Sequence, residues 1–345
     1  MNDTRIIISH FSGLWGYTPA VTDRLPASGS DRRYYRAGRD GDRVIGVINP
    51  DRDENRAFTG FTRHFINSGL PVPELLYYDE DDNICFLTDL GDITLLDHLN
   101  SLPESERWSQ QIDELFKRIL DYLIVFQVEG IKGLDLSLCH PHRQFDNQSM
   151  LWDMNYFKYM FLKLARIPFN EKRLEMDFHE LAAFLCQARS DYFLYRDFQS
   201  ANIMIVNGNP FFIDYQGGRL GAPHYDAASL VFDAKLKMPE ETRRILTDHY
   251  VAGFCSATGY ERSQFLIHMT GFSVIRLMQA LGAFGYRGLY EGKPGFADSI
   301  YPALNDLEML LLRARDEGLK LPEMYNMVAA GLFRETAARI EKSGT

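Results

Sequence analysis

The sequence predicts an α+β fold of two lobes, a small lobe made of a sheet and a helix followed by a larger, mostly helical lobe. Two observations predict it. Up to about residue 91, short β-like runs alternate with turn residues. Beyond residue 91, apolar residues recur at spacings of three and four, the period of amphipathic helices. A chain of 345 residues is long enough for each lobe to bury its own core.

The first lobe, residues 1–91, should begin with a short helix that caps it. Residues 44–48 are apolar and typical of a strand, which a proline ends. A stripe of phenylalanines predicts a helix over 54–67. Two more strands, 75–78 and 84–87, flank an acidic turn. The lobe is therefore predicted to be a small sheet with one helix inserted.

The second lobe, residues 92–345, should be a series of amphipathic helices. Apolar residues between Trp108 and Phe126 predict the first long one. Further helices are expected at about 148–166, 173–189, 240–257, 262–284, 300–316 and 322–342. Asp89-Leu90-Gly91 forms the predicted joint between the lobes. A cleft between lobes is a common ligand site, so the joint is where we expect one.

Composition excludes several classes of function. The formal charge is −10, from 37 basic and 47 acidic side chains, which disfavours nucleic acid and anionic membranes as partners. The four cysteines show no CxxC spacing, which argues against a disulfide framework or a zinc cluster. The N-terminus lacks a signal-peptide pattern, and no stretch approaches the ~20 apolar residues of a membrane span. We therefore expect a cytoplasmic protein and predict no oligomeric state.

A predicted hairpin carries the residues that point to chemistry. Two short apolar runs flank an Asn-Gly turn signal within 203–213, a strong indication of a β-hairpin. Folding this hairpin about Gly208 and Asn209 places Asn202 opposite residues 214–215, at the open end of the ladder. Directly opposed Cβ atoms lie about 5 Å apart. The pattern therefore predicts that Asn202 and Asp214 are neighbours in space.

These residue types suit phosphoryl transfer. The side chains of Asn202 and Asp214 offer two oxygen ligands to a hard Mg²⁺ ion. Asp197 lies on the loop that enters the hairpin and can face the same point. A carboxylate beside a two-ligand magnesium site is the arrangement that transfers a phosphoryl group, because the metal neutralises the phosphates while the base accepts the hydroxyl proton.

The same stretch resembles the catalytic loop and metal motif of the aminoglycoside phosphotransferase/choline kinase family, which is related to protein kinases. The resemblance implies a bilobal protein-kinase-like fold, with ATP as the phosphoryl donor and Mg²⁺ as the metal. It also implies that Asp197 is the catalytic base and that Asn202 and Asp214 hold magnesium. Tyr195, which stands where the family usually has His, and Asp226, in a Tyr-Asp segment similar to that of the family, are implied to support the loop.

The first lobe extends the resemblance to the nucleotide site. The Arg-Arg-Tyr-x-Arg core at 32–36 looks like that of kinases that phosphorylate N-acetylmuramate and N-acetylglucosamine at the anomeric hydroxyl. The nucleotide-binding residues implied in this way are Ser30, Arg32, Arg36, Glu54, Asp89 and Gly91. The lysine expected on strand 44–48 is missing, and Asn49 is its nearest counterpart. We expect Arg36 or Arg32 to contact the phosphates in its place.

The acceptor should lie between the catalytic loop and the segment from about 140 to 189. Aromatic rings for stacking and oxygens for hydroxyl groups are concentrated there, which predicts a sugar pocket formed by Asp146, Trp152, Asp153, Asn155 and Tyr156. A sugar or amino sugar is the predicted acceptor, and an aminoglycoside, choline or ethanolamine is the alternative. The missing lysine leaves a non-catalytic nucleotide-binding pseudokinase as a hypothesis of another class, although a scaffold has no chemical need for Asp197, Asn202 and Asp214 together.

Overall fold

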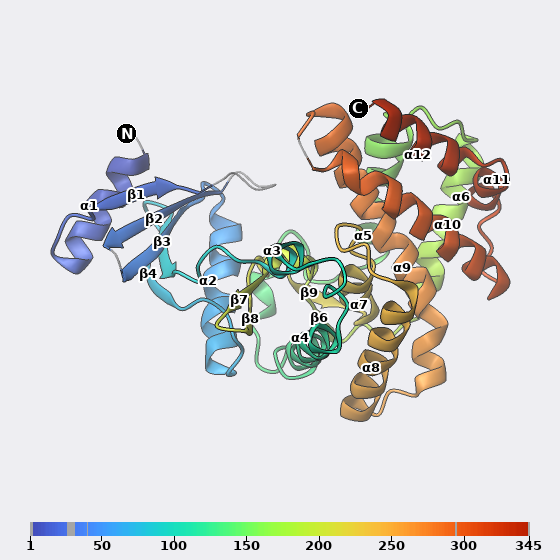
Figure 1. Ribbon diagram of the computed structural model, residues 1–345. Coiled ribbons are helices and arrows are strands. Elements are labelled where there is room, and N and C mark those ends of the chain that lie inside the picture. Colours follow the sequence, from blue (N-terminus) through green and yellow to red (C-terminus); the bar gives the residue numbers. More distant parts are fainter. Residues whose placement is uncertain (1–2, 26–31, 40, 294, 344–345) are drawn as a thin grey trace.

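The computed structural model describes residues 3–25, 32–39, 41–293 and 295–343. Its first part is a five-stranded antiparallel sheet with the strand order β1-β2-β3-β5-β4, seen at the left of Figure 1. The strands are β1 (Val21–Arg24), β2 (Arg33–Arg39), β3 (Asp42–Ile48), β4 (Leu75–Asp79) and β5 (Ile84–Thr88). Three of them lie where the sequence predicts strands.

Helices cover both faces of this sheet. Helix α1 (Asp3–Trp15) buries Ile7 and Phe11 against one face. A side chain at position 46 of β3 would collide with Ile7, so Gly46 allows the helix to approach closely. Helix α2 (Arg52–Asn67) begins at Asp51, whose carboxylate accepts the Glu54 backbone N–H. Its phenylalanine stripe packs into the main core of the molecule, as its period predicts.

A central layer joins the sheet to the helices (Figure 1). It contains α3 (Leu95–Ser101), α4 (Gln110–Val128), the hairpin of β7 (Ile203–Val206) and β8 (Asn209–Phe212), and the pair β6 (Tyr192–Leu194) and β9 (Arg219–Gly221). Phe65 of α2, Phe126 of α4 and Phe193 of β6 meet edge to face in one buried cluster. The hairpin joins this cluster through Phe212 of β8, whose ring meets the Phe126 ring edge to face.

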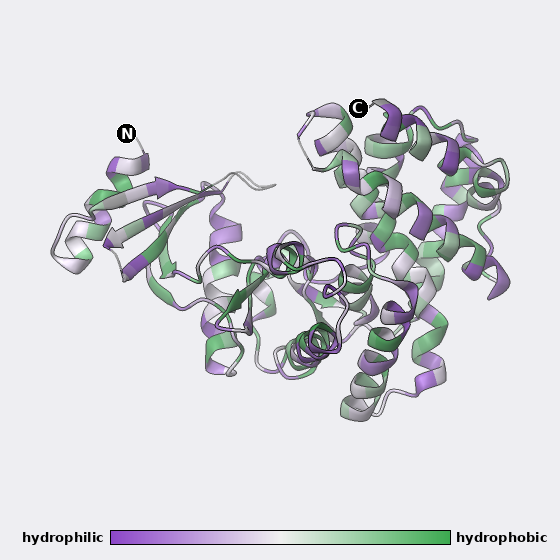
Figure 2. Cartoon of the chain, in the orientation of Figure 1, coloured by the Kyte–Doolittle hydropathy of each residue, from purple (hydrophilic) through white to green (hydrophobic). Residues whose placement is uncertain are grey.

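The rest of the chain is helical. The helices are α5 (Asn147–Phe157), α6 (Glu171–Leu185), α7 (His224–Val231), α8 (Glu240–Thr258), α9 (Arg262–Phe284), α10 (Ile300–Asp316), α11 (Pro322–Ala329) and α12 (Leu332–Ser343). Short 3₁₀ turns lie at 136–138, 200–202 and 297–299. Two π-helical turns, η2 (Lys158–Leu162) and η4 (Gly285–Tyr290), extend α5 and α9. In Figure 2 the outer helices at the right carry both hydrophilic and hydrophobic residues, as amphipathic helices do.

Residues 262–290 are long and apolar enough to cross a membrane by length and composition alone. In the fold, 78% of the most apolar window of this helix is buried. Helix α9 packs against α5, α7 and α10, so its apolar character on all sides is that of a central core helix.

The predicted α+β architecture, with a small sheet and helix followed by a mostly helical part, is confirmed. The predicted helix 322–342 is in fact two helices, because Gly331 adopts a left-handed φ of 70° between them. Helix α7 was not predicted because all of its residues are buried, which removes the amphipathic stripe. The division of the chain at residue 91 stays a prediction.

A buried carboxylate should make stability depend on pH. Burial raises the pKa of Asp177 to about 6, although its Oδ2 accepts the Met324 backbone N–H at the start of α11 (2.8 Å). The pKa of Asp177 is higher in the folded protein than in the unfolded chain. The contribution of this group to stability is therefore fully present below the unfolded pKa and is lost as pH rises through the folded pKa of about 6. We expect Asp177→Asn to gain stability relative to the parent between pH 4 and pH 7.5, by about 2–3 kcal/mol.

Urea unfolding of both proteins at several pH values would measure this difference. The exposed Asp316→Asn serves as the control that changes the same charge without burial. Parallel stability profiles for the parent and Asp177→Asn would contradict the raised pKa.

Candidate active site

The β7–β8 hairpin turns one residue earlier than predicted. Asn207 and Gly208, with φ of 51° and 76°, form the two-residue turn, rather than Gly208 and Asn209. A turn of this type needs positive φ at both positions, which Asn and Gly adopt most easily. Residue 202 therefore pairs with residue 213, whose N–H donates to the Asn202 carbonyl oxygen (3.1 Å).

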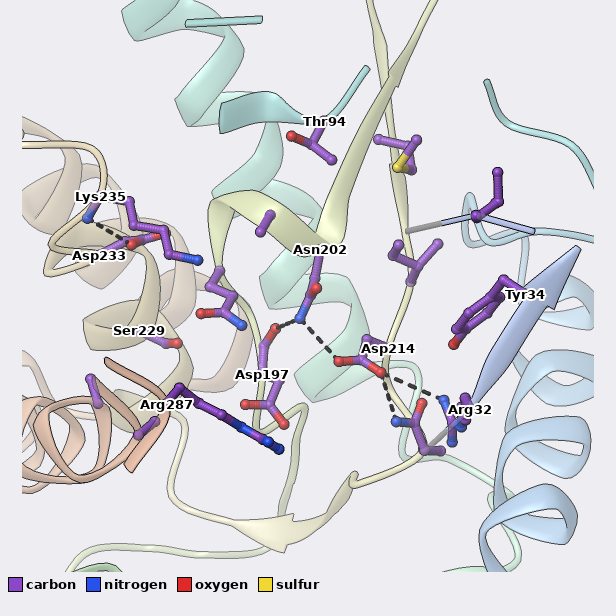
Figure 3. A pocket seen from close by; sticks show the side chains of 18 of the residues that line it. Arg32, Tyr34, Thr94, Asp197, Asn202, Asp214, Ser229, Asp233, Lys235 and Arg287 are labelled. Atoms are coloured by element: carbon purple, nitrogen blue, oxygen red, sulfur yellow. Dashed lines mark hydrogen bonds and ion pairs between the residues drawn. The ribbon is translucent and has the colours of Figure 1, made fainter. Parts of the chain in front are cut away.

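Asn202 and Asp214 nevertheless converge. Asp214 has a left-handed φ of 69°, which turns the chain just after the hairpin. The Asn202 side-chain amide donates to Asp214 Oδ2 (3.3 Å) and to the Asp197 carbonyl oxygen (2.9 Å). Figure 3 shows the three residues together. Both amide contacts use Nδ2, which leaves the Asn202 oxygen as the group that can ligate a metal.

Asp226 of α7 holds the backbone of the loop that carries Asp197. Its carboxylate accepts the backbone N–H groups of Tyr195 (2.7 Å) and Arg196 (2.9 Å). The Tyr195 hydroxyl donates to the Ile213 carbonyl oxygen (2.7 Å), which links the loop to the hairpin. Burial raises the pKa of Asp226 to about 7 against the opposing effect of these N–H donors. The loop is thus held through backbone contacts, in a conformation where Arg196 has φ of 83°.

Asp197 sits in a strongly perturbed environment. Burial and the nearby Asp214 carboxylate raise its pKa, while the positive charges of Arg196 and Arg276 lower it. A raised pKa makes a carboxylate a better proton acceptor, which is the property that a general base requires.

A cavity of about 860 Å³ joins these residues to the first lobe. It is lined by Arg32, Glu54, Asp89 and Gly91 of the predicted nucleotide set and by Asp197, Asn202 and Asp214. Ser30 lies outside the described residues. Arg36 is engaged elsewhere, because its guanidinium forms a two-pronged contact with Asp89 (2.6 and 3.0 Å) and a further ion pair with Asp92 (2.9 Å). Arg36 therefore fastens β2 to the joint rather than facing the cavity.

Arg32 occupies the region of the missing lysine. Arg33 pairs with Ile48 in the β2–β3 ladder, so Arg32 and Asn49 are the next facing residues. The buried Arg32 guanidinium lies 2.8 Å from Glu54 and 3.6 Å from Asp214 Oδ1. The Asn49 amide donates to the other Glu54 oxygen (2.8 Å). A cation from the residue just before β2 thus reaches the α2 glutamate that a lysine on β3 was expected to pair with.

The five predicted acceptor residues all lie in the described part of the chain, but they do not share one site. The cavity lining includes Tyr156 but not the other four. Asp153 is buried in an ion pair with Arg196. Asp146 accepts the Ser149 N–H as the N-cap of α5. Trp152 packs on the His142 ring at the surface, and the Asn155 amide donates to the Leu151 carbonyl oxygen.

The sequence pattern misled here because residues close in sequence on a helix point in different directions. Asp153 in fact supports the loop: its carboxylate binds Arg196 Nη1 at 2.7 Å and accepts the Tyr225 hydroxyl at 3.1 Å. The Arg196 guanidinium also lies over the Phe145 ring, 4.9 Å from its centroid. Asp153 thus helps to hold the position of Asp197 indirectly, through Arg196, the preceding residue in the chain.

Five polar or charged residues that line the cavity from α7, α9 and the segments that follow these two helices were also not predicted from the sequence. They are Ser229, Lys235, Arg276, Arg287 and Lys293. They come from three separate segments with no shared spacing, so only the packing of α7 and α9 brings them together. The formal charge of −10 does not reveal this cluster of cations, because the net charge is a sum over the whole chain.

Comparison with known proteins places this geometry in context. Residues 23–266, more than half of the chain, match the phosphotransferase enzyme family. An N-acetylmuramate/N-acetylglucosamine kinase from Pseudomonas aeruginosa is 27% identical over 335 residues, which cover 92% of this chain and 91% of that protein. The protein of the same name from Neisseria meningitidis serogroup B is 25% identical over 292 residues, covering 82% and 83%.

The fold has solved counterparts as well. The choline kinase LicA from Streptococcus pneumoniae aligns with a TM-score of 0.60 at 14% identity, covering 90% of this chain and 100% of that one. At this identity the likeness concerns the fold alone. These matches confirm the resemblance seen in the motifs and the protein-kinase-like architecture that it implied.

Proposed function

Because the chain belongs to the phosphotransferase enzyme family, as a kinase that acts on a hydroxyl of a small molecule, we propose that it transfers the γ-phosphoryl group of ATP, in a Mg²⁺-dependent reaction, to a hydroxyl of a sugar or an amino sugar. One observation carries the proposal: the Asn202 amide contacts both Asp214 and the backbone of Asp197, and all three residues line one cavity that also reaches the first lobe. Phosphoryl transfer needs a base, a metal site and a nucleotide site in that arrangement.

The donor set fits magnesium. Asn202 offers an amide oxygen and Asp214 a carboxylate, and Mg²⁺ takes such hard oxygen ligands while keeping several waters and phosphate oxygens. Asp214 is also held by the Gln216 amide (2.7 Å), which orients its carboxylate toward Asn202. A bound Mg²⁺ would neutralise charge on the phosphates.

Asp197 would accept the proton of the attacking hydroxyl. Its side chain is placed by Asp226 through the backbone and by Asp153 through Arg196. Neither contact occupies the Asp197 carboxylate itself. Asp197 lines the cavity, so its carboxylate could receive a proton there from the acceptor.

The sugar assignment is supported by the relatives of the chain. The two proteins that match over most of its length are named for N-acetylmuramate and N-acetylglucosamine. A turnover screen with Mg-ATP against hexoses, hexosamines, choline and aminoglycosides, with product detected by mass, tests it. We expect a phosphorylated sugar. Turnover of choline or an aminoglycoside, with none on any sugar, would overturn the proposal.

Arg32 argues for an active enzyme rather than a pseudokinase. The α2 glutamate has a cationic partner other than lysine, since Arg32 bridges Glu54 and Asp214, and this ion pair would position the nucleotide phosphates. We expect Arg32→Gln to raise the KM for ATP on the order of 10-fold, the worth of one charge-assisted hydrogen bond. Steady-state kinetics at saturating acceptor would measure it, with the exposed Arg39→Gln as control.

A second variant separates this role from a folding effect. Because residue 49 faces residue 32 across the ladder, Asn49→Lys in the Arg32→Gln background returns a cation to the α2 glutamate from β3. We expect it to recover part of the lost ATP affinity. An unchanged KM in Arg32→Gln would contradict the phosphate contact of Arg32, whereas a parent protein that binds Mg-ATP but phosphorylates none of the acceptors would support the scaffold hypothesis.

A further inference from the structure

We propose that Arg36 is a positioning residue for the base of the nucleotide: from β2 it holds the joint between the lobes, residues 89–92, in the conformation that presents the joint backbone to the base. The inference rests on the proposed function in taking ATP as the nucleotide. It gives Arg36 a role other than the phosphate contact expected from the sequence. Arg36 acts through the joint, because the joint lines the cavity and Arg36 itself does not.

An apolar part of the cavity lies beside the joint. Ile45 of β3 and Leu87 of β5 are paired in the sheet, and both line the cavity just before the joint. Met204 of β7 lines it from the hairpin, where it pairs with Thr94 just after the joint. Residues 89–91 line the cavity as well, so their peptide groups are close to the polar edge of a ligand there. A flat heterocyclic base, apolar on its faces and polar at its edge, matches this lining.

Arg36 belongs to the same row of the sheet. It pairs with Ile45 across β2 and β3, just as Ile45 pairs with Leu87 across β3 and β5. Directly paired residues of neighbouring strands point to the same face of a sheet. The Arg36 side chain therefore leaves the sheet on the face that lines the cavity, and it reaches the joint from that side.

The Arg36 guanidinium contacts the joint at several atoms. Its Nε and Nη2 donate to the two carboxylate oxygens of Asp89 (2.6 and 3.0 Å), and Nη2 also donates to the Gly91 carbonyl oxygen (3.3 Å). Asp89 Oδ1 accepts the Gly91 N–H as well (3.0 Å), where Gly91 has a left-handed φ of 82°. Leu90 is thus held between two anchored residues. Because the side chains of Arg36 and Asp89 are each only 12% exposed, water screens their charges weakly.

A base that binds to the joint gains affinity when the joint is already ordered. Without Arg36, the Asp89 carboxylate loses its two-pronged partner, and Gly91 can sample many backbone conformations. The free energy of binding the base would then include the cost of ordering the joint. Four residues of extended chain, about 13 Å, separate Arg36 from Arg32, where we propose that the phosphates bind. Phosphate affinity should therefore not depend on Arg36.

Dividing ATP into its two halves tests this role. Adenosine lacks the phosphates, and tripolyphosphate with Mg²⁺ lacks the nucleoside. We expect Arg36→Gln to weaken the binding of adenosine and of Mg-ATP by about 10-fold in calorimetry, and to leave the binding of Mg-tripolyphosphate unchanged. Arg32→Gln should show the opposite pattern, with lower affinity for Mg-tripolyphosphate and Mg-ATP and unchanged affinity for adenosine.

A second variant excludes a folding effect as the cause. Asp89→Asn breaks the same charge pair from the other side and should give the pattern of Arg36→Gln, and the double variant should bind adenosine no more weakly than either single variant. Arg39→Gln, an exposed arginine of the same strand, should bind all three ligands like the parent.

Two outcomes would overturn the inference. One is an equal loss of affinity for adenosine and Mg-tripolyphosphate in Arg36→Gln, and the other is an unchanged affinity for adenosine in both Arg36→Gln and Asp89→Asn. Turnover of a sugar by the parent decides the proposed function separately, so either conclusion can fail while the other stands.

Discussion

Asp197→Asn should lower turnover by about 10²–10⁴-fold while leaving Mg-ATP affinity nearly unchanged, because this is the usual contribution of a positioned general base. The asparagine side chain has the same shape but cannot accept the proton. The Asn202 amide donates to the backbone carbonyl of residue 197, so the substitution leaves that contact in place. The Asp226 contacts to the loop are also backbone contacts. The loss should therefore appear in kcat.

The experiment needs a matched carboxylate near the loop. Asp191 is exposed and paired with Arg189 (3.2 Å), so Asp191→Asn changes charge close to the site without touching the cavity. Steady-state turnover and calorimetry of both variants give the comparison. If Asp197→Asn turns over like the parent, the hydroxyl needs no base or another residue serves as one.

Asp214→Ala should abolish Mg²⁺-dependent binding of ATP. The substitution removes the carboxylate that stands beside Asn202, and one amide oxygen is a poor magnesium site by itself. It also leaves the buried Arg32 with Glu54 as its remaining carboxylate partner in the described structure. The loss should therefore exceed that of Arg32→Gln.

Titration with ATP in the presence of Mg²⁺ and again with excess chelator measures the metal-dependent part of the affinity. In the parent, chelation should weaken binding strongly, whereas in Asp214→Ala the two titrations should coincide. Asp316→Ala, an exposed carboxylate on α10, controls for charge. Unchanged Mg-ATP affinity in Asp214→Ala would remove the metal assignment. Thermal unfolding of the same samples would show whether the variant is folded.

Features that depend on neighbouring residues in the chain could be predicted from the sequence. The phenylalanine stripe of α2, the period of α4 and the Asn-Gly turn of the hairpin are local signals, and each led to the right element. The error of one residue in the turn did not separate Asn202 from Asp214, because the positive φ of Asp214 turns its side chain back. Their proposed roles stay predictions.

The acceptor residues were harder to predict, because their orientation depends on packing. A segment rich in Asp, Asn and aromatic rings predicts a sugar pocket, yet Asp153 is buried in an ion pair with Arg196 and only Tyr156 of that set lines the cavity. Helix α5 packs against α9, and that contact decides which of its side chains turn toward the cavity. Composition carries no information about this choice.

The sequence by itself determined the order of lobes, the hairpin and the group formed by Asp197, Asn202 and Asp214, because these depend on spacing along a short stretch of chain. Only the tertiary structure decided which cation replaces the missing lysine and what surrounds the acceptor. Arg32 meets Glu54 through the pairing of β2 with β3 and the packing of α2. Lys235 and Arg287 line the same cavity although they are 52 positions apart in sequence, because α7 and α9, the helices that precede them, pack together. Contacts between distant segments are set by burial of the whole core, which no local period records.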